Sequence, residues 1–104
     1  MIKSGGENVA SREVEELIYQ HPKVSEVAVI GIPHPYWIEA VAAVVVPKAG
    51  ETVSEEEMLA FCKERLASFK APKYVFITDT LPRNPSGKIL KRELRLRYDT
   101  LPTS

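Results

Sequence analysis

Apolar residues recur along the chain at two different spacings, and each spacing predicts a different kind of element. After Ser11 they recur at the spacing of one helical face, which predicts a helix with Ser11 as its N-cap, ending near His21 because Pro22 follows. We place His21 at the surface or in the helix cap, not in a catalytic site. A second helix is predicted after Ser54, whose hydroxyl can cap it, and it gives way before Pro72.

Three further segments are rich in β-branched residues and are bounded by turn signals. They predict strands at residues 24–32, 40–47 and 74–80. The segment 40–47 is apolar on both faces, so we expect a central strand that is covered by helices. A third helix is expected after Lys88, with its basic side chains in solvent: Lys91, Arg92, Arg95 and Arg97.

Near the N-terminus, Gly5 and Gly6 separate two short polar segments. Adjacent glycines suit a hairpin turn, but they also let the backbone approach a ligand closely, so both interpretations stay open. The order of the elements predicts an α+β fold. We expect one domain over residues 1–104, with a small, mostly antiparallel three-stranded sheet, a short N-terminal hairpin and about three flanking helices.

Composition narrows the classes of function. Among 104 residues, 14 basic side chains balance 14 acidic ones, so no overall field favours nucleic acid or an acidic membrane surface. Cys62 is the only cysteine, which excludes an internal disulfide, and with two histidines it forms no spaced ligand set for a metal. We expect Cys62 to be a buried structural thiol. No apolar run is long enough to span a bilayer, and a cytoplasmic location is expected.

Two aromatic residues stand in settings that suit a flat ligand. Trp37 lies in the connection 33–39, where it can either cover the edge of the sheet or stack on a purine. Phe69 is flanked by cations, among them Lys70 and Lys73, a combination that can stack a base and hold phosphates. A solvated helix end has the same composition, so both interpretations of Phe69 stay open.

The most distinctive stretch is PRNPSGKILKRELR at residues 82–95. Pro85, Ser86 and Gly87 favour a tight turn, because proline restricts φ and glycine tolerates φ > 0. Such a turn presents the next side chain, Lys88, at a defined point. Taken alone, this lysine is either an ordinary exposed cation or a functional group that acts on an anionic substrate.

Four stretches occur in an order that resembles the C-terminal domain of adenylate-forming enzymes, in their acyl-CoA synthetase branch. They are SGGEN at 4–8, GIPHPYWIEAVAAVVV at 31–46, FKAPK at 69–73 and PRNPSGKILKREL at 82–94. The resemblance covers nearly the whole chain, and the last stretch is its most specific part. It implies a two-step ligase reaction. A carboxylic acid and Mg²⁺·ATP give an acyl-adenylate and pyrophosphate, and the thiol of coenzyme A then gives a thioester and AMP.

The resemblance also implies a partner and a motion. In the family, this domain rotates between the two steps on a large N-terminal domain, which carries the acyl pocket and most of the ATP site. That domain and the hinge residue are expected upstream of Met1, so residues 1–104 alone are expected to fold without catalysing. A fatty or aryl acid is the expected substrate.

By the same resemblance, Lys88 enters the active site for adenylation and bridges carboxylate and phosphate oxygens, while Gly87 keeps the approach to the nucleotide open. Four residues are implied at the thiolation site: Ser4, Gly5, Gly6 and Glu7. The two glycines line the pantetheine tunnel and the glutamate helps to arrange the site. Four more match positions that meet the nucleotide of coenzyme A in some relatives: Trp37, Phe69, Lys70 and Lys73.

Two other functions remain open at this point. The first is a free-standing module that binds a nucleotide or phosphate through the Lys88 region and an aromatic platform. The second is an adenylation-domain fragment that docks on a carrier protein and passes its acyl group to a tethered pantetheine. The short end at residues 101–104 resembles a natural terminus, which favours free coenzyme A over a following carrier domain.

Overall fold

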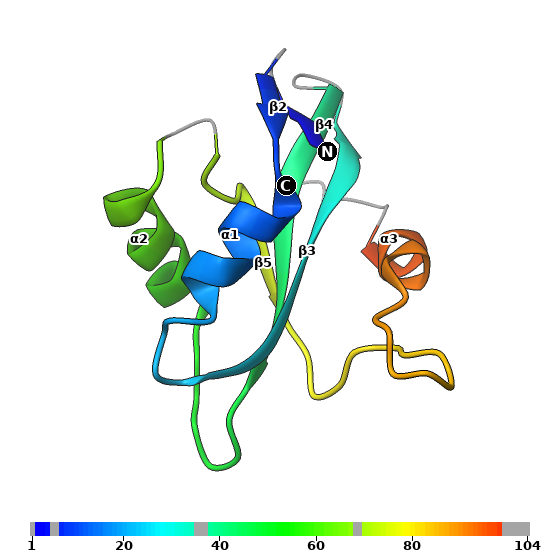
Figure 1. The fold of residues 1–104 in the computed structure, drawn as a ribbon. Coiled ribbons are helices and arrows are strands. Elements are labelled where there is room, and N and C mark those ends of the chain that lie inside the picture. Colours follow the sequence, from blue (N-terminus) through cyan, green and yellow to red (C-terminus); the bar gives the residue numbers. More distant parts are fainter. Residues whose placement is uncertain (1, 5–6, 35–37, 68–69, 99–104) are drawn as a thin grey trace.

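The observed elements follow the predicted order of two short strands, a helix, two long strands, a helix, a strand and a helix (Figure 1). The structure is a computed structural model, and it describes residues 2–4, 7–34, 38–67 and 70–98. The elements are β1 Ile2–Ser4, β2 Glu7–Val9, α1 Ser11–Ile18, β3 Val24–His34, β4 Ile38–Pro47, α2 Glu55–Arg65, β5 Tyr74–Ile77 and α3 Lys91–Tyr98. The predicted α+β class is therefore confirmed.

Strand β4 is the centre of the sheet. It pairs antiparallel with β3 along almost its whole length, antiparallel with β1 where Ser4 meets Ile38, and parallel with β5. The sheet is mostly antiparallel, as predicted, and the N-terminal hairpin is continuous with it. Strand β3 continues to His34 and β4 begins at Ile38, so both are longer than predicted. The reason is that β3 and β4 remain paired beyond the segments whose sequence is apolar, as far as His34 and Ile38.

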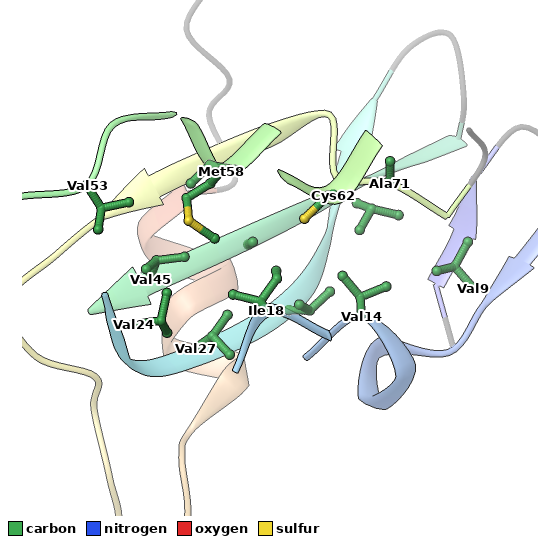
Figure 2. Packing of buried hydrophobic residues seen from close by; sticks show 14 of the residues in the cluster. Val9, Val14, Ile18, Val24, Val27, Val45, Val53, Met58, Cys62 and Ala71 are labelled. Atoms are coloured by element: carbon green, nitrogen blue, oxygen red, sulfur yellow. The ribbon is translucent and has the colours of Figure 1, made fainter. Parts of the chain in front are cut away.

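The alternation of side chains along a strand divides the apolar residues of β3 and β4 between two faces. One face, the α1/α2 face, packs against both of those helices (Figure 2), through Val27, Val29, Val41, Ala43 and Val45. The opposite face, the α3 face, is covered by α3 (Figure 1), through Ala28, Ile30, Ile32, Ala40, Ala42 and Val44. Strand β4 is thus buried on both sides, which confirms the prediction of a covered central strand.

The helix ends agree only in part with the predictions. Ser54 caps α2 as predicted, because its hydroxyl accepts a hydrogen bond from Glu57 N at 3.1 Å. Ser11 is not an N-cap: Ala10 holds that position without a side-chain bond, and Ser11 is already the first helical residue. Helix α2 ends at Arg65, well before Pro72, because Leu66 has extended backbone angles. In the part of the chain that the structure describes, no helix is long and apolar enough to cross a membrane.

His21 is buried, so its predicted place at the surface is wrong. Its ring contacts Phe61 edge to face at 4.9 Å, and Nε2 lies 3.3 Å from a carboxylate oxygen of Glu57. Nδ1 accepts a hydrogen bond from Lys23 N at 3.1 Å, which is a capping role within the turn. Helix α2 supplies both covering residues, so the local sequence around His21 did not indicate its burial.

Glutamates from the two helices bond to the outer strands of the sheet. Glu15 of α1 accepts a hydrogen bond from Val29 N of β3 at 2.8 Å, and Glu55 of α2 accepts one from Val75 N of β5 at 3.1 Å. These bonds satisfy backbone donors that no neighbouring strand pairs. They also fix the position of each helix relative to the strand that it bonds, and so the points from which the connecting loops start.

Candidate functional site

Lys88 lies in a small hairpin between β5 and α3. Leu90 N donates a hydrogen bond to Pro82 O at 2.8 Å. Within this closure, Asn84 N donates to Lys88 O at 2.9 Å, and Gly87 N donates to Asn84 O at 2.9 Å. We call residues 82–90 the Lys88 loop. Its ends are tied together, so the position of Lys88 depends on bonds inside the loop.

Gly87 gives this loop its turn, as predicted. Its φ is +89°, and a Cβ there would meet no atom within 4 Å, so glycine is required for backbone conformation and not for space. The next residue, Lys88, is exposed, and among the described residues no side chain pairs with its ammonium group. An open groove of about 630 Å³ runs beside it, lined by Asn84, Lys88, Ile89, Leu90, Lys91 and Arg92. Cations combined with apolar side chains suit an anionic ligand.

Two side chains that the sequence analysis did not single out hold the Lys88 loop. The Oδ1 of Asn84 accepts hydrogen bonds from Ser86 N at 3.1 Å, Ser86 Oγ at 2.8 Å and Lys88 N at 2.9 Å. The Nη1 of Arg83 donates to Gly87 O at 2.6 Å, and its Nη2 pairs with Glu26 of β3. Asparagine at the start of a turn is a known signal that can identify Asn84. The Arg83–Glu26 pair joins distant segments and has no local signal.

Lys91, the first residue of α3, is not the solvated cation that we predicted. Its Nζ lies 2.8 Å from Glu15 Oε2 and 3.3 Å from Ser11 Oγ. Because Glu15 also bonds Val29 N, one carboxylate joins α1, the edge of β3 and the start of α3. The other cations of that helix are exposed, as predicted: Arg92, Arg95 and Arg97. The C-terminal end of the Lys88 loop is therefore anchored across the edge of the sheet.

Lys70 and Lys73 lie on the other side of the sheet from α3. Lys70 Nζ pairs with Glu13 of α1 at 3.1 Å, and Lys73 N donates to Val41 O at 2.8 Å. The side chain of Lys73 lines an open pocket of about 300 Å³ at the start of β5, together with Leu59, Lys63, Ala71 and Pro72. The structure thus brings Lys73 to a second basic region, separate from the groove beside Lys88.

The N-terminal hairpin places its backbone beside the beginning of β4. Ser4 pairs with Glu7 across the hairpin and with Ile38 of β4, which confirms the predicted hairpin. Several predicted site residues lie outside the described residues: Gly5, Gly6, Trp37 and Phe69. The side chains of Ser4 and Glu7 are likewise outside the description. The roles implied for these six residues therefore stay predictions.

Cys62 is confirmed as a buried thiol. Burial raises its pKa from the ordinary value of 9.0 to about 11, against an opposing effect of the nearby Arg65. A thiol with a raised pKa is a poor nucleophile at neutral pH. Within the described ranges, no group of three or more His, Cys, Asp or Glu side chains gathers as metal ligands would.

The chain resembles known proteins over nearly all of its length. Residues 13–88 match the family model described as the AMP-binding enzyme C-terminal domain, and the matched segment ends at Lys88. The crotonobetaine/carnitine–CoA ligase of Salmonella arizonae is 50% identical over 95 residues, which are 91% of this chain and 18% of that protein.

Solved structures give the same result. A fatty acyl CoA synthetase from Mycobacterium tuberculosis is 52% identical with a TM-score of 0.88, over 95% of this chain and 20% of that one. The ATP-bound MatB from Rhodopseudomonas palustris is 44% identical with a TM-score of 0.90, over 93% of this chain and 19% of that one. The chain thus spans about a fifth of the length of these relatives.

Proposed function

This chain belongs to the AMP-binding enzyme C-terminal domain family, and we propose that it is the rotating C-terminal domain of an AMP-forming acyl-CoA ligase. Its similarity to a CoA ligase and to a fatty acyl CoA synthetase, at 50% and 52% identity, supports this proposal. Residues 1–104 form one domain in this scheme. Its main partner is a large N-terminal domain that carries the acyl pocket.

In the first step, a carboxylate oxygen of the acid attacks the α-phosphorus of ATP, and the bond to pyrophosphate breaks. Both reacting groups are anionic, so a cation between them stabilises the transition state. Lys88 supplies this cation, because a compact ammonium on a flexible stem can reach both groups. Gly87 leaves the approach to the nucleotide open. The observation that carries the proposal is the exposure of Lys88 at a glycine-dependent turn inside the family-matched segment.

In the second step, the thiol sulfur of coenzyme A attacks the carbonyl carbon of the acyl-adenylate, and AMP leaves. We assign the thiolation site to Ser4, Gly5, Gly6 and Glu7, with the glycines along the pantetheine. We assign the nucleotide of coenzyme A to Trp37, Phe69, Lys70 and Lys73. The pocket beside Lys73 supports the second assignment, because it combines an apolar surface for adenine with the cations of Lys63 and Lys73.

The acid that we propose is a fatty or aryl acid, in keeping with the fatty acyl CoA synthetase among the relatives. Mg²⁺ accompanies ATP in this reaction and neutralises phosphate charge. The described part of this chain gathers no cluster of acidic ligands, so the N-terminal domain is proposed to hold the ion. The cytoplasm is the proposed location, since ATP and coenzyme A are its substrates.

The test is the substitution Lys88→Ala in the full-length ligase, with each half-reaction measured separately. Acid-dependent release of pyrophosphate is expected to fall by about 10²- to 10³-fold, because one preorganised charge is lost from the transition state. Transfer from synthetic acyl-adenylate to coenzyme A is expected to change by less than about threefold. Lys48→Ala is the matched control, because Lys48 is also exposed and lies in the turn before α2.

A normal rate of pyrophosphate release by the Lys88→Ala enzyme would exclude the adenylation role. The two-domain division has its own test in the isolated chain. Residues 1–104 should form no acyl-CoA from acid, ATP and coenzyme A, because Lys88 then has no positioned substrate. Turnover by the isolated chain at the rate of the full-length enzyme would contradict this division.

A further inference from the structure

We infer that Asn84 and Arg83 are positioning residues for Lys88, which act through the backbone of the Lys88 loop and not on the substrate. The inference rests on the proposed adenylation role of Lys88 and adds the residues that aim it. It follows from the hydrogen bonds around one peptide group, the one that joins Gly87 to Lys88.

Asn84 bonds both backbone polar groups of Lys88. Its side-chain Oδ1 accepts from Lys88 N at 2.9 Å, and its own N–H donates to Lys88 O at 2.9 Å. The same Oδ1 accepts two further bonds from Ser86, so its orientation is over-determined. A single asparagine therefore fixes the backbone from which the lysine side chain starts.

Arg83 bonds the other end of the same peptide group. Its Nη1 donates to Gly87 O at 2.6 Å, so the Gly87–Lys88 peptide is held at its oxygen by Arg83 and at its N–H by Asn84. The guanidinium is in turn paired with Glu26 of β3. This pair connects the peptide group to the sheet, whose position the buried core determines.

The peptide group needs these bonds because glycine on one side of it restricts it weakly. Gly87 has φ of +89° and open space around it, so its own conformation does not prevent rotation of the peptide plane. Such a rotation would turn the Cα–Cβ bond of Lys88 and displace the ammonium. A displacement of about 1 Å can cost about 10²-fold in rate.

The test uses full-length ligase with substitutions that remove or keep these bonds. Asn84→Ala removes the acceptor, and Asn84→Asp keeps an oxygen at the same place. Arg83→Gln removes the ion pair, and Glu26→Gln removes its partner without touching the loop. Lys48→Ala again serves as the control for a lost surface cation.

We expect Asn84→Ala and Arg83→Gln to lower acid-dependent pyrophosphate release by about 10- to 100-fold. Asn84→Asp should recover most of the rate, and Glu26→Gln should fall between wild type and Arg83→Gln. Transfer from synthetic acyl-adenylate to coenzyme A should change by less than about threefold, which also verifies that each preparation is folded.

The same substitutions made in the Lys88→Ala enzyme distinguish positioning of Lys88 from direct action on the substrate. If Asn84 and Arg83 act through Lys88, their substitution should cause no further loss once the lysine is gone. A further tenfold loss in that background would overturn the inference and point to direct contact with the substrate. Equal losses in both half-reactions would also overturn it, because they indicate a general structural role.

The same experiment distinguishes this inference from the proposed function. If Lys88→Ala abolishes adenylation while Asn84→Ala and Arg83→Gln leave it unchanged, only the positioning inference is wrong. If Lys88→Ala itself retains normal adenylation, the proposed function is wrong and the inference fails with it.

Discussion

The two faces of the sheet are covered in different ways. On the α1/α2 face, two helices and the N-terminal strands enclose a large apolar cluster that includes Ile18 and Cys62 (Figure 2). On the α3 face, a single helix contributes Leu94, and the aromatic rings of Phe76 and Tyr98 stack at 4.3 Å beside it. The Lys88 loop connects β5 to α3, the single helix that covers this second face (Figure 1).

The apolar core of the α1/α2 face stabilises the fold, whereas the Lys88 loop beside the α3 face presents a charge to solvent. In the proposed function Lys88 must meet an anionic substrate, so it cannot be held by burial, because burial of an unpaired charge is costly. The Lys88 loop is instead held by hydrogen bonds and by the ion pair between Lys91 and Glu15. Truncation of apolar core residues on the α1/α2 face should therefore reduce stability alone, whereas truncation of core residues on the α3 face should also reduce adenylation.

The largest expected effect comes from matched truncations on the two faces. Ile18 and Leu94 are both fully buried, so Ile18→Ala and Leu94→Ala should each lower the free energy of unfolding by about 2–5 kcal/mol. Urea unfolding followed by circular dichroism measures this loss. At temperatures where both variants are folded, Leu94→Ala in the full-length ligase should lower pyrophosphate release by about tenfold.

Ile18→Ala is the control for that second measurement, and it should leave pyrophosphate release close to that of the wild type. The reason is position: Leu94 lies in the helix that begins just after the Lys88 loop, and Ile18 lies on the opposite face. Equal loss of adenylation in the two variants would mean that the faces are not independent.

The next effect concerns how well the α1/α2 face excludes water. Because Cys62 is fully buried and burial raises its pKa to about 11, alkylation of the folded chain by iodoacetamide at pH 8 should be at least about tenfold slower than that of an ordinary exposed thiol with pKa 9.0. The same shift makes stability depend on pH. The folded thiol keeps its proton up to pH about 11, while the unfolded one loses it near 9.0, so the free energy of unfolding falls as pH rises between these values.

A Cys62→Ala variant isolates this contribution. Its urea midpoint should decline less than that of the wild type between pH 9 and pH 11, since the other titrating groups are unchanged. Parallel declines of the two midpoints, together with fast alkylation of the folded wild type, would show that water reaches the thiol.

Much of the fold could be predicted because its signals are local. The apolar run that became β4 indicated a central strand, and Ser54 indicated the start of α2. The burial of His21 was not predicted, because it depends on Phe61 and Glu57 of another helix. Contacts of this kind come from tertiary packing, which local sequence patterns do not encode.

The candidate site likewise combines features that have a local signal in the sequence with features that have none. The turn at Gly87 and the exposure of Lys88 followed from residues adjacent in the sequence. The pairs Lys91–Glu15 and Arg83–Glu26 did not, because each joins elements that lie far apart in the chain. Arginine and lysine in an apparently solvated basic segment gave no indication of which of them would find a carboxylate.

The smallest expected effect on the free energy of unfolding comes from two glycines, which separate stability from function most sharply. Gly87 and Gly50 both have positive φ, at +89° and +80°, and a Cβ at either would meet nothing within 4 Å. Alanine at either position should therefore cost only the conformational strain of about 1–2 kcal/mol in the free energy of unfolding. Gly50 lies in the turn after β4, whereas Gly87 precedes Lys88.

Equal strain at the two glycines should have unequal consequences for the reaction. Gly87→Ala should lower pyrophosphate release by the full-length ligase by about tenfold, because strain at Gly87 is relieved by rotating the peptide group that carries Lys88. Gly50→Ala should leave that rate unchanged, because neither residue next to Gly50 is a candidate site residue. If the two variants lose stability equally and adenylation equally, the orientation of the Gly87–Lys88 peptide is not what presents the lysine, and the contrast between a packed face and a hydrogen-bonded loop has no bearing on catalysis.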